Sequence, residues 1–335
     1  MHTGKSYGLF EFLHWTRRKI YVLVLAGTLP VIFYQVLGLK WMGIPWAVVA
    51  ILGTATAFIV GFKNVQTYNR TWEARSIWSE IVGNSRAWGT MCRDYPKNPW
   101  ESKSLIYRHL AWLTALRHQL REPRTWETTS TPHNAEYGRF FAIPERETTL
   151  DAELQQYITD EERKYILATK NKATQIAGLQ SKAAARLFAA QEIVVLQLVD
   201  MQRAIKDLYL QQSRAERIKD FPYPRQFATV SSLFVKLFCL LLPFGLLREF
   251  DKLNDGVEGF MSGKMTWLVI PFSVAISWMY TSLDQVGEST ESPFEGGAND
   301  VPITQICRKI EVDLREMLGE TDLPPLLKPT NDIVL

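Results

Sequence analysis

The sequence has few of the residues on which enzymes, metal sites and disulfide frameworks depend. Its three cysteines, Cys92, Cys239 and Cys307, are far apart and form no CxxC pair. This spacing predicts free, buried thiols and a reducing compartment. The five histidines have no metal-ligand spacing, and neither an HExxH motif nor a nucleophile elbow occurs. We therefore expect no catalytic site and predict that the protein is not an enzyme.

The chain also lacks a strong charge of either sign. It carries 38 Lys and Arg against 35 Asp and Glu, a formal net charge of +3. The basic residues are dispersed and form no stripe along any one segment. A nucleic-acid partner would require such a concentration of positive charge, so we expect none.

Long apolar runs, by contrast, are abundant. The mean hydropathy of -0.09 resembles that of a soluble protein only because apolar and polar stretches average out. Crossing the hydrocarbon core of a bilayer takes about 20 apolar residues. Four windows are long enough: Ile20–Leu39, Ile44–Phe62, Phe227–Leu247 and Met265–Leu283. The sequence predicts an integral membrane protein with four transmembrane helices in contact with the lipid bilayer.

The basic residues near the ends of these windows predict the orientation of the chain. They are Lys5, Arg17, Arg18 and Lys19 before the first window, and Lys63, Arg70 and Arg75 after the second. The loop between these two windows carries only Lys40. Because Lys and Arg accumulate on the cytoplasmic side of a membrane, both termini and the large middle region are expected in the cytoplasm.

The polar part of the chain is predicted to be helical as well, so the fold class is all-α. Lys103–Arg121 has the pattern of an amphipathic helix, and apolar residues recur at helical spacing from Leu187 to Leu208. Residues 122–150 contain three prolines and predict a loop, and a last helix is expected over Ile303–Leu318. Four regions result: 1–62 with the first two membrane helices, 63–224 as a cytosolic helical region, 225–284 with the last two membrane helices, and 285–335 as a cytosolic segment and tail.

The second apolar window continues without a turn signal into a polar, aromatic-rich helix. Within it Gly53, Ala57 and Gly61 form a row of small residues, and small rows allow helices to approach closely in lipid. Thr54, Phe58 and Phe62 form the neighbouring row. These side chains either pack against lipid and other helices or project into a space that several such helices surround.

Charged residues in or near the membrane windows each allow two interpretations. Lys236 lies near the middle of the third window, where a charge is costly; it either pairs with a neighbouring helix or attracts anions. An acidic stretch begins at the end of the fourth window, at Asp284, Glu288, Glu291, Glu295 and Asp300. Its spacing matches no EF-hand loop, so it predicts a solvated acidic turn in preference to a calcium site.

An ordered set of short motifs resembles the bestrophin family, including its bacterial members. The motifs cover most of residues 15–310: Gly61-Phe62-Lys63-Asn64, the run from Tyr68 to Arg75, Trp78, Ser85-Arg86, Leu116-Arg117, Leu120-Arg121, Pro222-Tyr223-Pro224, the run from Leu242 to Leu246, Leu283-Asp284, Gly287-Glu288, Pro293-Phe294 and Asn299-Asp300. The resemblance implies a homopentamer around a single axial pore. It also implies four membrane segments, cytosolic termini and a helical cytosolic body.

The resemblance assigns pore positions to particular residues. The narrow neck of bestrophins is lined by three bulky apolar residues one turn apart, which fall here on Thr54, Phe58 and Phe62. Thr54 departs from the usual aliphatic residue, and its hydroxyl is expected to wet the outer neck and weaken a dewetting gate. A second, cytosolic aperture precedes a proline in the family and falls on Tyr223.

The function implied is a passive channel for chloride and other small monovalent anions. Inward-turned ring edges are electropositive and suit an anion, and Lys63, Arg70 and Lys236 are candidates for attracting ions. A monovalent cation channel of the same fold, or a non-conducting structural or assembly protein of the membrane, remain the alternatives. The expected location is a bacterial plasma (inner) membrane.

Calcium control, known in animal bestrophins, is expected to be weak or absent. Their calcium clasp is built largely from the acidic stretch after the fourth span. Only Asp300 occupies a plausible liganding position here, while Ser292 and Gly297 stand where better ligands are needed. We therefore predict no cofactor.

Overall fold

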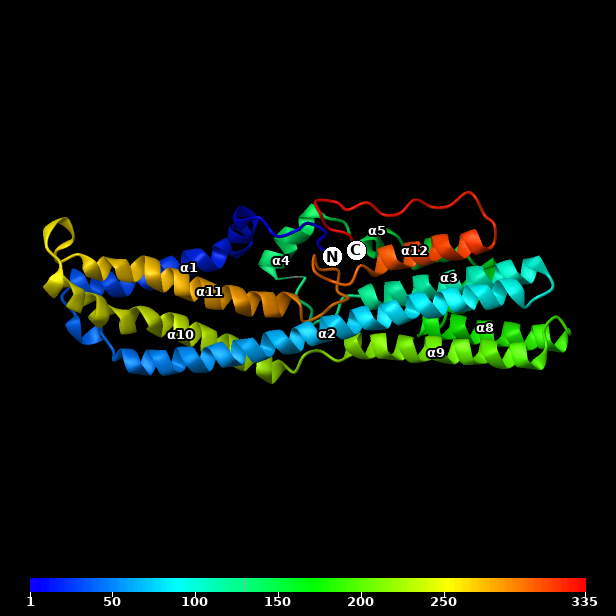
Figure 1. The fold of residues 1–335 in the computed structure, drawn as a ribbon, viewed down its shortest axis with the longest axis horizontal. Helices are drawn as coiled ribbons and strands as arrows, with labels where there is room; N and C mark the ends of the chain where they lie inside the picture. Colours follow the sequence, from blue (N-terminus) through cyan, green and yellow to red (C-terminus); the bar gives the residue numbers. More distant parts are fainter. Residues whose placement is uncertain (130) are drawn as a thin grey trace.

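The computed structural model is an elongated bundle of helices in which α2 runs almost from end to end (Figure 1). It describes residues 1–129 and 131–335. The longer helices are α1 (Leu9–Gln35), α2 (Trp46–Asp94), α3 (Pro99–Arg121), α8 (Lys172–Ala189), α9 (Val195–Asp220), α10 (Arg225–Lys252), α11 (Val269–Ser289) and α12 (Ile303–Met317). The short ones are η1 (Lys40–Met42), α4 (Pro132–Tyr137), η2 (Gly138–Phe140), α5 (Pro144–Glu147), α6 (Leu150–Leu154), α7 (Asp160–Leu167), η3 (Leu253–Gly256), η4 (Gly259–Met261) and η5 (Met265–Leu268). These two ranges contain isolated bridges but no strand, which confirms the all-α prediction.

Helix α2 links the two halves of the bundle. It begins directly after Pro45 and continues for 49 residues without an internal proline. At a rise of 1.5 Å per residue this is about 73 Å, more than twice the thickness of a hydrocarbon core. Its first half packs against α10 and α11, and its second half against α3, α9 and α12. The apolar window therefore does continue into the polar helix, as the missing turn signal predicts.

Three helical stretches in the described residues are long and apolar enough to cross a membrane. They are Lys40–Asp94, Arg225–Gly256 and Met265–Ser289, which contain α2, α10 and α11. Helix α1 is not among them. Its first half carries the cations of Arg17, Arg18 and Lys19, which leaves a shorter apolar part that also contains Pro30.

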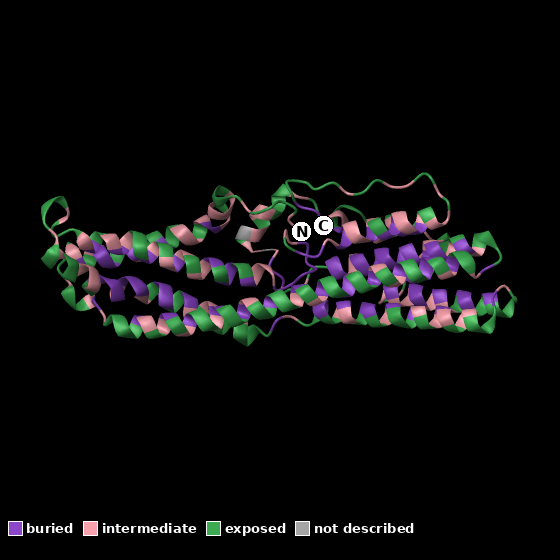
Figure 2. Cartoon of the chain, in the orientation of Figure 1, coloured by how far each residue is buried: buried purple, intermediate pink, exposed green. Residues whose placement is uncertain are grey.

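Each half of the bundle has its own hydrophobic cluster. At the apolar end the cluster joins α1, α2, α10 and α11 through residues such as Val31, Val60 and Leu242. At the polar end Trp78, Trp88 and Trp112 are almost completely buried among α2, α3, α8, α9 and α12. Figure 2 shows the greatest concentration of buried residues along α3 and its neighbours. The rigidity of α2 holds these two clusters in a defined relation.

Two sequence predictions for the polar half need correction. The described part of residues 122–150 is not a plain loop, because α4 and α5 form there, each with a proline in its first turn. The apolar periodicity from Leu187 to Leu208 is not one helix: α8 ends at Ala189 and α9 begins at Val195. Gln191, with φ of 58°, makes the reversal between them. Both helices present apolar faces to the same core, so the helical spacing of apolar residues continues on either side of the turn between α8 and α9.

The cysteine prediction is confirmed. Cys92, Cys239 and Cys307 are all free and buried. Burial raises the pKa of Cys92 and that of Cys307, the latter to about 12, so both thiols stay protonated and unreactive.

Candidate functional site

One face of α2 is left uncovered by the rest of the chain, and it carries the predicted neck residues. Phe58 and Phe62 expose 65% and 69% of their surface, and Thr54 is exposed beside them with its hydroxyl bonded to the Ala50 carbonyl at 3.0 Å. The opposite face is buried, for example at Val60. Other large residues of the helix, among them Ile51 and Val65, are exposed as well. An open face of this kind requires lipid, another chain or an enclosed space around it.

The row of small residues has two different surroundings. A side chain on Gly53 would collide with the Phe238 ring at 2.7 Å, so Gly53 permits the close approach of α2 and α10. A side chain on Gly61 would meet nothing within 4 Å. Gly61 and Ala57 line an open apolar groove of about 830 Å³, which Gly53 also borders and which contains Phe58. Only part of the row thus serves packing within the chain.

Lys63 follows Phe62 but turns away from the exposed face into a buried ion pair. Its Nζ lies 2.7 Å from Oδ1 of Asp284 on α11, and Ser231 on α10 donates to the same oxygen at 3.3 Å. Both charged side chains are more than nine-tenths buried. This pair joins α2, α10 and α11 at the end of their apolar halves. Its geometry indicates a structural role for Lys63 instead of the attraction of ions.

Arg70 is also held by the fold. Its guanidinium donates to the carbonyl oxygens of Ile218 and Phe221, both at 2.9 Å, and of Glu291 at 3.0 Å. The first two carbonyls lie at the end of α9, where helical carbonyls lack partners. Arg70 therefore fixes the linker between α9 and α10 against the middle of α2.

That linker contains the predicted aperture residue Tyr223, but the structure buries its side chain. Tyr223 exposes 8% of its surface, whereas Phe221, two residues earlier, exposes 68%. Phe221 also precedes a proline, Pro222, so a following proline does not by itself distinguish Phe221 from the predicted Tyr223. In this chain Phe221 is the linker side chain that is free to enter an open space.

Lys236 is exposed on α10. Across residues 1–129 and 131–335 no carboxylate lies within ion-pair distance of its ammonium group. The intrachain pair considered for it from the sequence is therefore not formed. An ammonium group left uncovered in an apolar helix needs water, a lipid phosphate or a neighbouring chain.

The acidic stretch is not the solvated turn that its composition predicts. Asp284, Glu291, Glu295 and Asp300 are all buried. Asp284 pairs with Lys63, and Glu291 pairs with Arg225 at 2.5 Å. The partners come from α2, α10 and other segments distant in the sequence. Local composition therefore could not reveal the burial.

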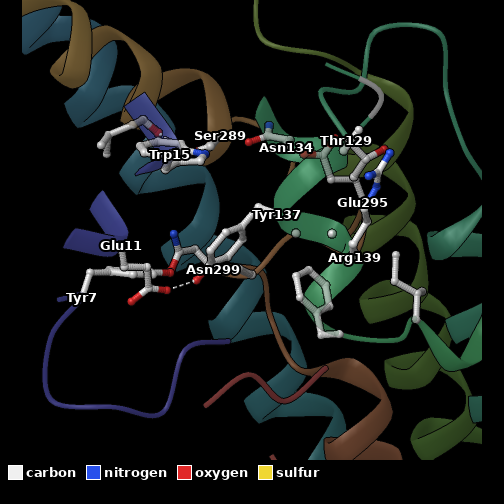
Figure 3. Close-up of a pocket in the computed structure, with 18 of the residues that line it drawn as sticks. Tyr7, Glu11, Trp15, Thr129, Asn134, Tyr137, Arg139, Ser289, Glu295 and Asn299 are labelled. Carbon is white, nitrogen blue, oxygen red and sulfur yellow. Dashed lines mark hydrogen bonds between the residues drawn. The ribbon is translucent and has the colours of Figure 1, made fainter. Parts of the chain in front are cut away.

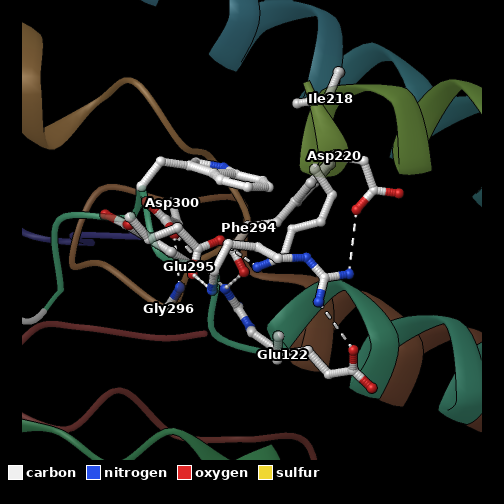
Figure 4. A network of polar contacts seen from close by, with 12 residues as sticks. Glu122, Ile218, Asp220, Phe294, Glu295, Gly296 and Asp300 are labelled. Atoms are coloured by element: carbon white, nitrogen blue, oxygen red, sulfur yellow. Dashed lines mark hydrogen bonds and ion pairs between the residues drawn. The ribbon is translucent and has the colours of Figure 1, made fainter. Parts of the chain in front are cut away.

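Asp300 and Glu295 are bound by the protein itself (Figure 4). One Asp300 oxygen accepts from the amides of Gly296 and Gly297 at 2.8 and 2.9 Å, with Arg121 at 3.7 Å. Glu295 accepts from the amide and hydroxyl of Thr128 at 2.8 and 2.7 Å.

These residues do not fit calcium, which takes six to eight oxygen ligands. Both Glu295 oxygens and one of the two Asp300 oxygens are occupied by donors, and the Arg121 cation 3.7 Å from Asp300 repels a metal cation. The described residues hold no group of three or more His, Cys, Asp or Glu able to bind a metal.

Two buried arginines on α3 hold this region together, and the sequence interpretation assigned them no role. Arg121 donates to the carbonyls of Phe294 and Val301 at 3.0 and 3.3 Å. Arg117 pairs with Glu145 at 2.7 Å and also with Glu153. A usable signal was present, because both cations belong to a helix with a strongly apolar pattern.

The burial of Glu295 predicts a pH-dependent stability. Desolvation and the neighbouring Asp300 charge raise the pKa of Glu295 above its ordinary 4.5. The native state therefore holds this proton more tightly than the unfolded state. The stabilisation is complete below pH 4.5 and is lost as the pH rises through the native pKa.

We expect the unfolding temperature of the detergent-solubilised protein to fall between pH 5 and pH 8. Glu295→Gln should reduce this slope, because its amide cannot titrate. Glu249→Gln, at a half-exposed carboxylate far from Asp300, is the control and should leave the slope unchanged. A slope equal in all three proteins would contradict the assignment.

The geometry defines a class before any relative is considered: a helical membrane protein in which one uninterrupted helix carries an uncovered aromatic face from an apolar to a polar region. Known proteins narrow this class. The family model of bacterial and fungal bestrophin proteins matches residues 16–316. The chain belongs to the bestrophin family, whose members are channels and not enzymes.

Individual relatives agree with this assignment. The voltage-dependent anion channel-forming protein YneE of Escherichia coli K12 is 26% identical over 297 residues, covering 89% of this chain and 84% of the relative. A voltage-dependent anion channel-forming protein of Mesorhizobium japonicum is 23% identical over 279 residues, 83% of this chain and 76% of its own length. A crystal structure of a bacterial bestrophin homolog from Klebsiella pneumoniae has a TM-score of 0.74 at 24% identity, covering 91% of this chain and 99% of that one. This last match supports the same fold.

Proposed function

We propose that this protein is the subunit of a passive anion channel, a homopentamer with one axial pore lined by α2. The observation that carries the proposal is the row of Thr54, Phe58 and Phe62 on the uncovered face of α2, whose opposite face is packed. The relatives named as anion channel-forming proteins support the same function.

In the proposed pore, five copies of Phe58 and Phe62 form two aromatic rings. The edge of an aromatic ring is electropositive, so inward-turned edges stabilise a chloride ion that has lost part of its water. Thr54 adds a hydroxyl at the outer end, which keeps that ring wetter than an aliphatic one. Small monovalent anions are the substrates that this arrangement suits.

The cytosolic aperture is proposed at the linker between α9 and α10. The sequence and the family pattern point to Tyr223, and the exposure of the side chains favours Phe221. The Arg70 contacts to the Phe221 carbonyl would hold this aperture at a fixed place relative to the neck. Lys236 is left as the candidate for attracting anions, because the cations of Lys63 and Arg70 are already engaged.

Four membrane spans with cytoplasmic termini, in a bacterial inner membrane, complete the proposal. The apolar part of α1 packs along α11 and exposes several large residues on its other side, among them Val22, Leu25 and Leu29. This exposed apolar side of α1 is suited to contact with lipid. Helix α1 would therefore span the bilayer together with the loop that follows it, despite its cationic first half.

A cation pore of the same fold is less well supported. That alternative depended on the acidic stretch, and the buried Asp284 and Glu291 are neutralised by Lys63 and Arg225. Calcium control is proposed to be weak or absent, since Asp300 is committed to backbone amides.

The decisive experiment is the reversal potential of the purified protein in a planar bilayer under a potassium chloride gradient. We expect a shift toward the chloride equilibrium potential. A shift toward potassium would overturn the anion proposal. Absence of current from a verified pentamer would favour a non-conducting structural protein.

Phe58→Ala tests the neck directly. Removing five rings should widen the constriction and raise single-channel conductance a few-fold, with the pentamer intact. The matched control is Phe260→Ala, another exposed phenylalanine, which lies in η4 away from α2 and should leave conductance unchanged. Equal conductance in both variants would place the neck elsewhere.

A further inference from the structure

A deep cavity of about 510 Å³ lies at the junction of the two halves of the bundle, outside the proposed pore (Figure 3). It is enclosed by the start of α1, by α4 and η2, by residues 141–146 and by the end of α11 with the loop that follows. Its volume is within the range of about 300–1,000 Å³ that small-molecule sites occupy. The proposed conduction gives this cavity no role.

Aromatic side chains form much of the wall. Tyr7, Phe12 and Trp15 come from the N-terminal segment and α1, while Tyr137 and Phe141 come from the α4–η2 region. Several of these rings contact one another, with centroids 5.8 to 6.4 Å apart. Tyr7 is also tied to the opposite wall by a hydrogen bond from its hydroxyl to Asn299 at 2.9 Å. The wall therefore offers a formed apolar surface to a ligand.

Two guanidinium groups, of Arg139 and Arg146, bring positive charge to the cavity wall. Arg146 donates to the Glu295 carbonyl at 3.2 Å and keeps its remaining donors. Arg139 is exposed at the cavity, and within the described chain it forms no hydrogen bond or ion pair. Guanidinium groups bind carboxylate and phosphate through paired donors.

The carboxyl groups at the cavity do not cancel this charge. Both Glu295 oxygens accept hydrogen bonds from Thr128, and burial together with the Asp300 charge raises the pKa of Glu295. Glu11 accepts a hydrogen bond from the Tyr137 hydroxyl and contributes one negative charge. The cavity therefore has two guanidinium groups, of Arg139 and Arg146, beside the Glu11 carboxylate and a Glu295 whose oxygens are already engaged by Thr128.

The position of the cavity indicates how a ligand reaches it. Trp15 precedes the first apolar window by five residues, and Val286 follows the fourth by three. Tyrosine and tryptophan at this depth are typical of the membrane–water interface. Leu9 and Phe10, at the start of the same helix, expose 72% and 84% of their surface and suit lipid contact. An amphiphile can therefore enter from the inner leaflet.

We propose that this cavity binds an amphiphilic anion, with an acidic headgroup on Arg139 and Arg146 and an apolar body against the aromatic wall. The headgroup chemistry is shared by free fatty acids and by acidic phospholipids. Binding would tie the N-terminal segment to the end of α11, whose Asp284 holds Lys63 beside the exposed aromatic face. The binding itself does not depend on whether the protein conducts.

The test is calorimetric titration of dodecanoate, below its micellar concentration, into the full-length protein in nanodiscs of zwitterionic lipid. We expect saturable binding that dodecanol, which lacks the charge, does not reproduce. Arg139→Gln with Arg146→Gln should weaken it about ten-fold or more, because charge-assisted hydrogen bonds are lost. The control is Arg186→Gln with Arg203→Gln, two exposed arginines on the α8–α9 hairpin.

A cavity-filling variant and a change of nanodisc lipid test whether the binding occurs in this cavity and which ligand occupies it. Ala298→Phe should block binding by filling the cavity without altering charge. Loss of dodecanoate binding in nanodiscs containing phosphatidylglycerol would identify the lipid as the source, and unchanged binding would identify the free acid. Equal affinity in the wild type and the Arg139/Arg146 double variant, or no saturable binding at all, would overturn the proposal. Reversal potentials of the same variants would separate this outcome from a failure of the channel assignment.

Discussion

Replacement of Lys63 by methionine is expected to destabilise the protein by about 3–5 kcal/mol, the usual cost of removing one partner of a buried ion pair. Methionine keeps much of the apolar stem but leaves the Asp284 carboxylate buried with only the Ser231 hydroxyl. The effect can be measured as the shift in a denaturant titration of the protein in mixed micelles.

The chain offers a matched control in the exposed pair of Lys40 and Asp251, 3.2 Å apart. Lys40→Met should cost less than about 1 kcal/mol, because exposed pairs contribute little. The double variant Lys63→Met with Asp284→Asn should recover much of the loss by removing the unpaired charge. If the variants at Lys63 and Lys40 were equally stable, the buried pair would contribute no more than a surface pair.

Replacement of Arg121 by methionine should produce a loss of similar size at the junction of the two halves. This side chain is almost completely buried, between Glu145 at 3.6 Å and Asp300 at 3.7 Å, and it donates to two loop carbonyls. Its removal leaves buried carboxylates undercompensated and takes the donor from the Phe294 carbonyl, while the Val301 carbonyl keeps only the Ile303 amide at 2.8 Å. We expect this to cost about 3–5 kcal/mol.

The measurement for Arg121 combines stability with hydrogen exchange of residues 291–301. The amides of this segment should exchange faster in the variant, since the arginine is what ties the loop to α3. Arg121→Lys restores the charge without the forked donors and should recover only part of the stability. Arg186→Met, whose exposed guanidinium pairs with Glu101 at 2.9 Å, is the control and should cost less than about 1 kcal/mol. Unchanged exchange in Arg121→Met would show that other contacts order the loop.

Several features follow from the sequence because their causes are local. The all-α fold, the continuity of the helix through Phe62 and the buried state of the cysteines rest on periodicity, on missing turn residues and on residue type. The row of Thr54, Phe58 and Phe62 was likewise identifiable, since spacing along a helix decides which side chains share a face. The family pattern supplied the order of the motifs but not the contacts that they make.

Other features could be decided only by the tertiary structure. The acidic residues from Asp284 to Asp300 look solvated in the sequence, yet α2, α3 and α10 bring cations and amides to them. In the sequence Lys63 and Arg70 look available to ions. In the fold each binds a partner roughly 150 or more residues away, Lys63 the Asp284 carboxylate and Arg70 the Ile218 carbonyl. The exposure of Phe221 and the burial of Tyr223 depend on how the linker crosses α2.

The difference between the features that the sequence predicts and those that only the tertiary structure decides has one physical reason. Hydrophobic periodicity and helix propensity act over a few residues, so a sequence determines which segments are helical and which faces are apolar. The environment of a charge depends on every group within a few ångströms, and in a folded chain those groups come from distant segments. For this protein the sequence determined the helices and the exposed aromatic row, and the packing of those helices decided which charges remain free.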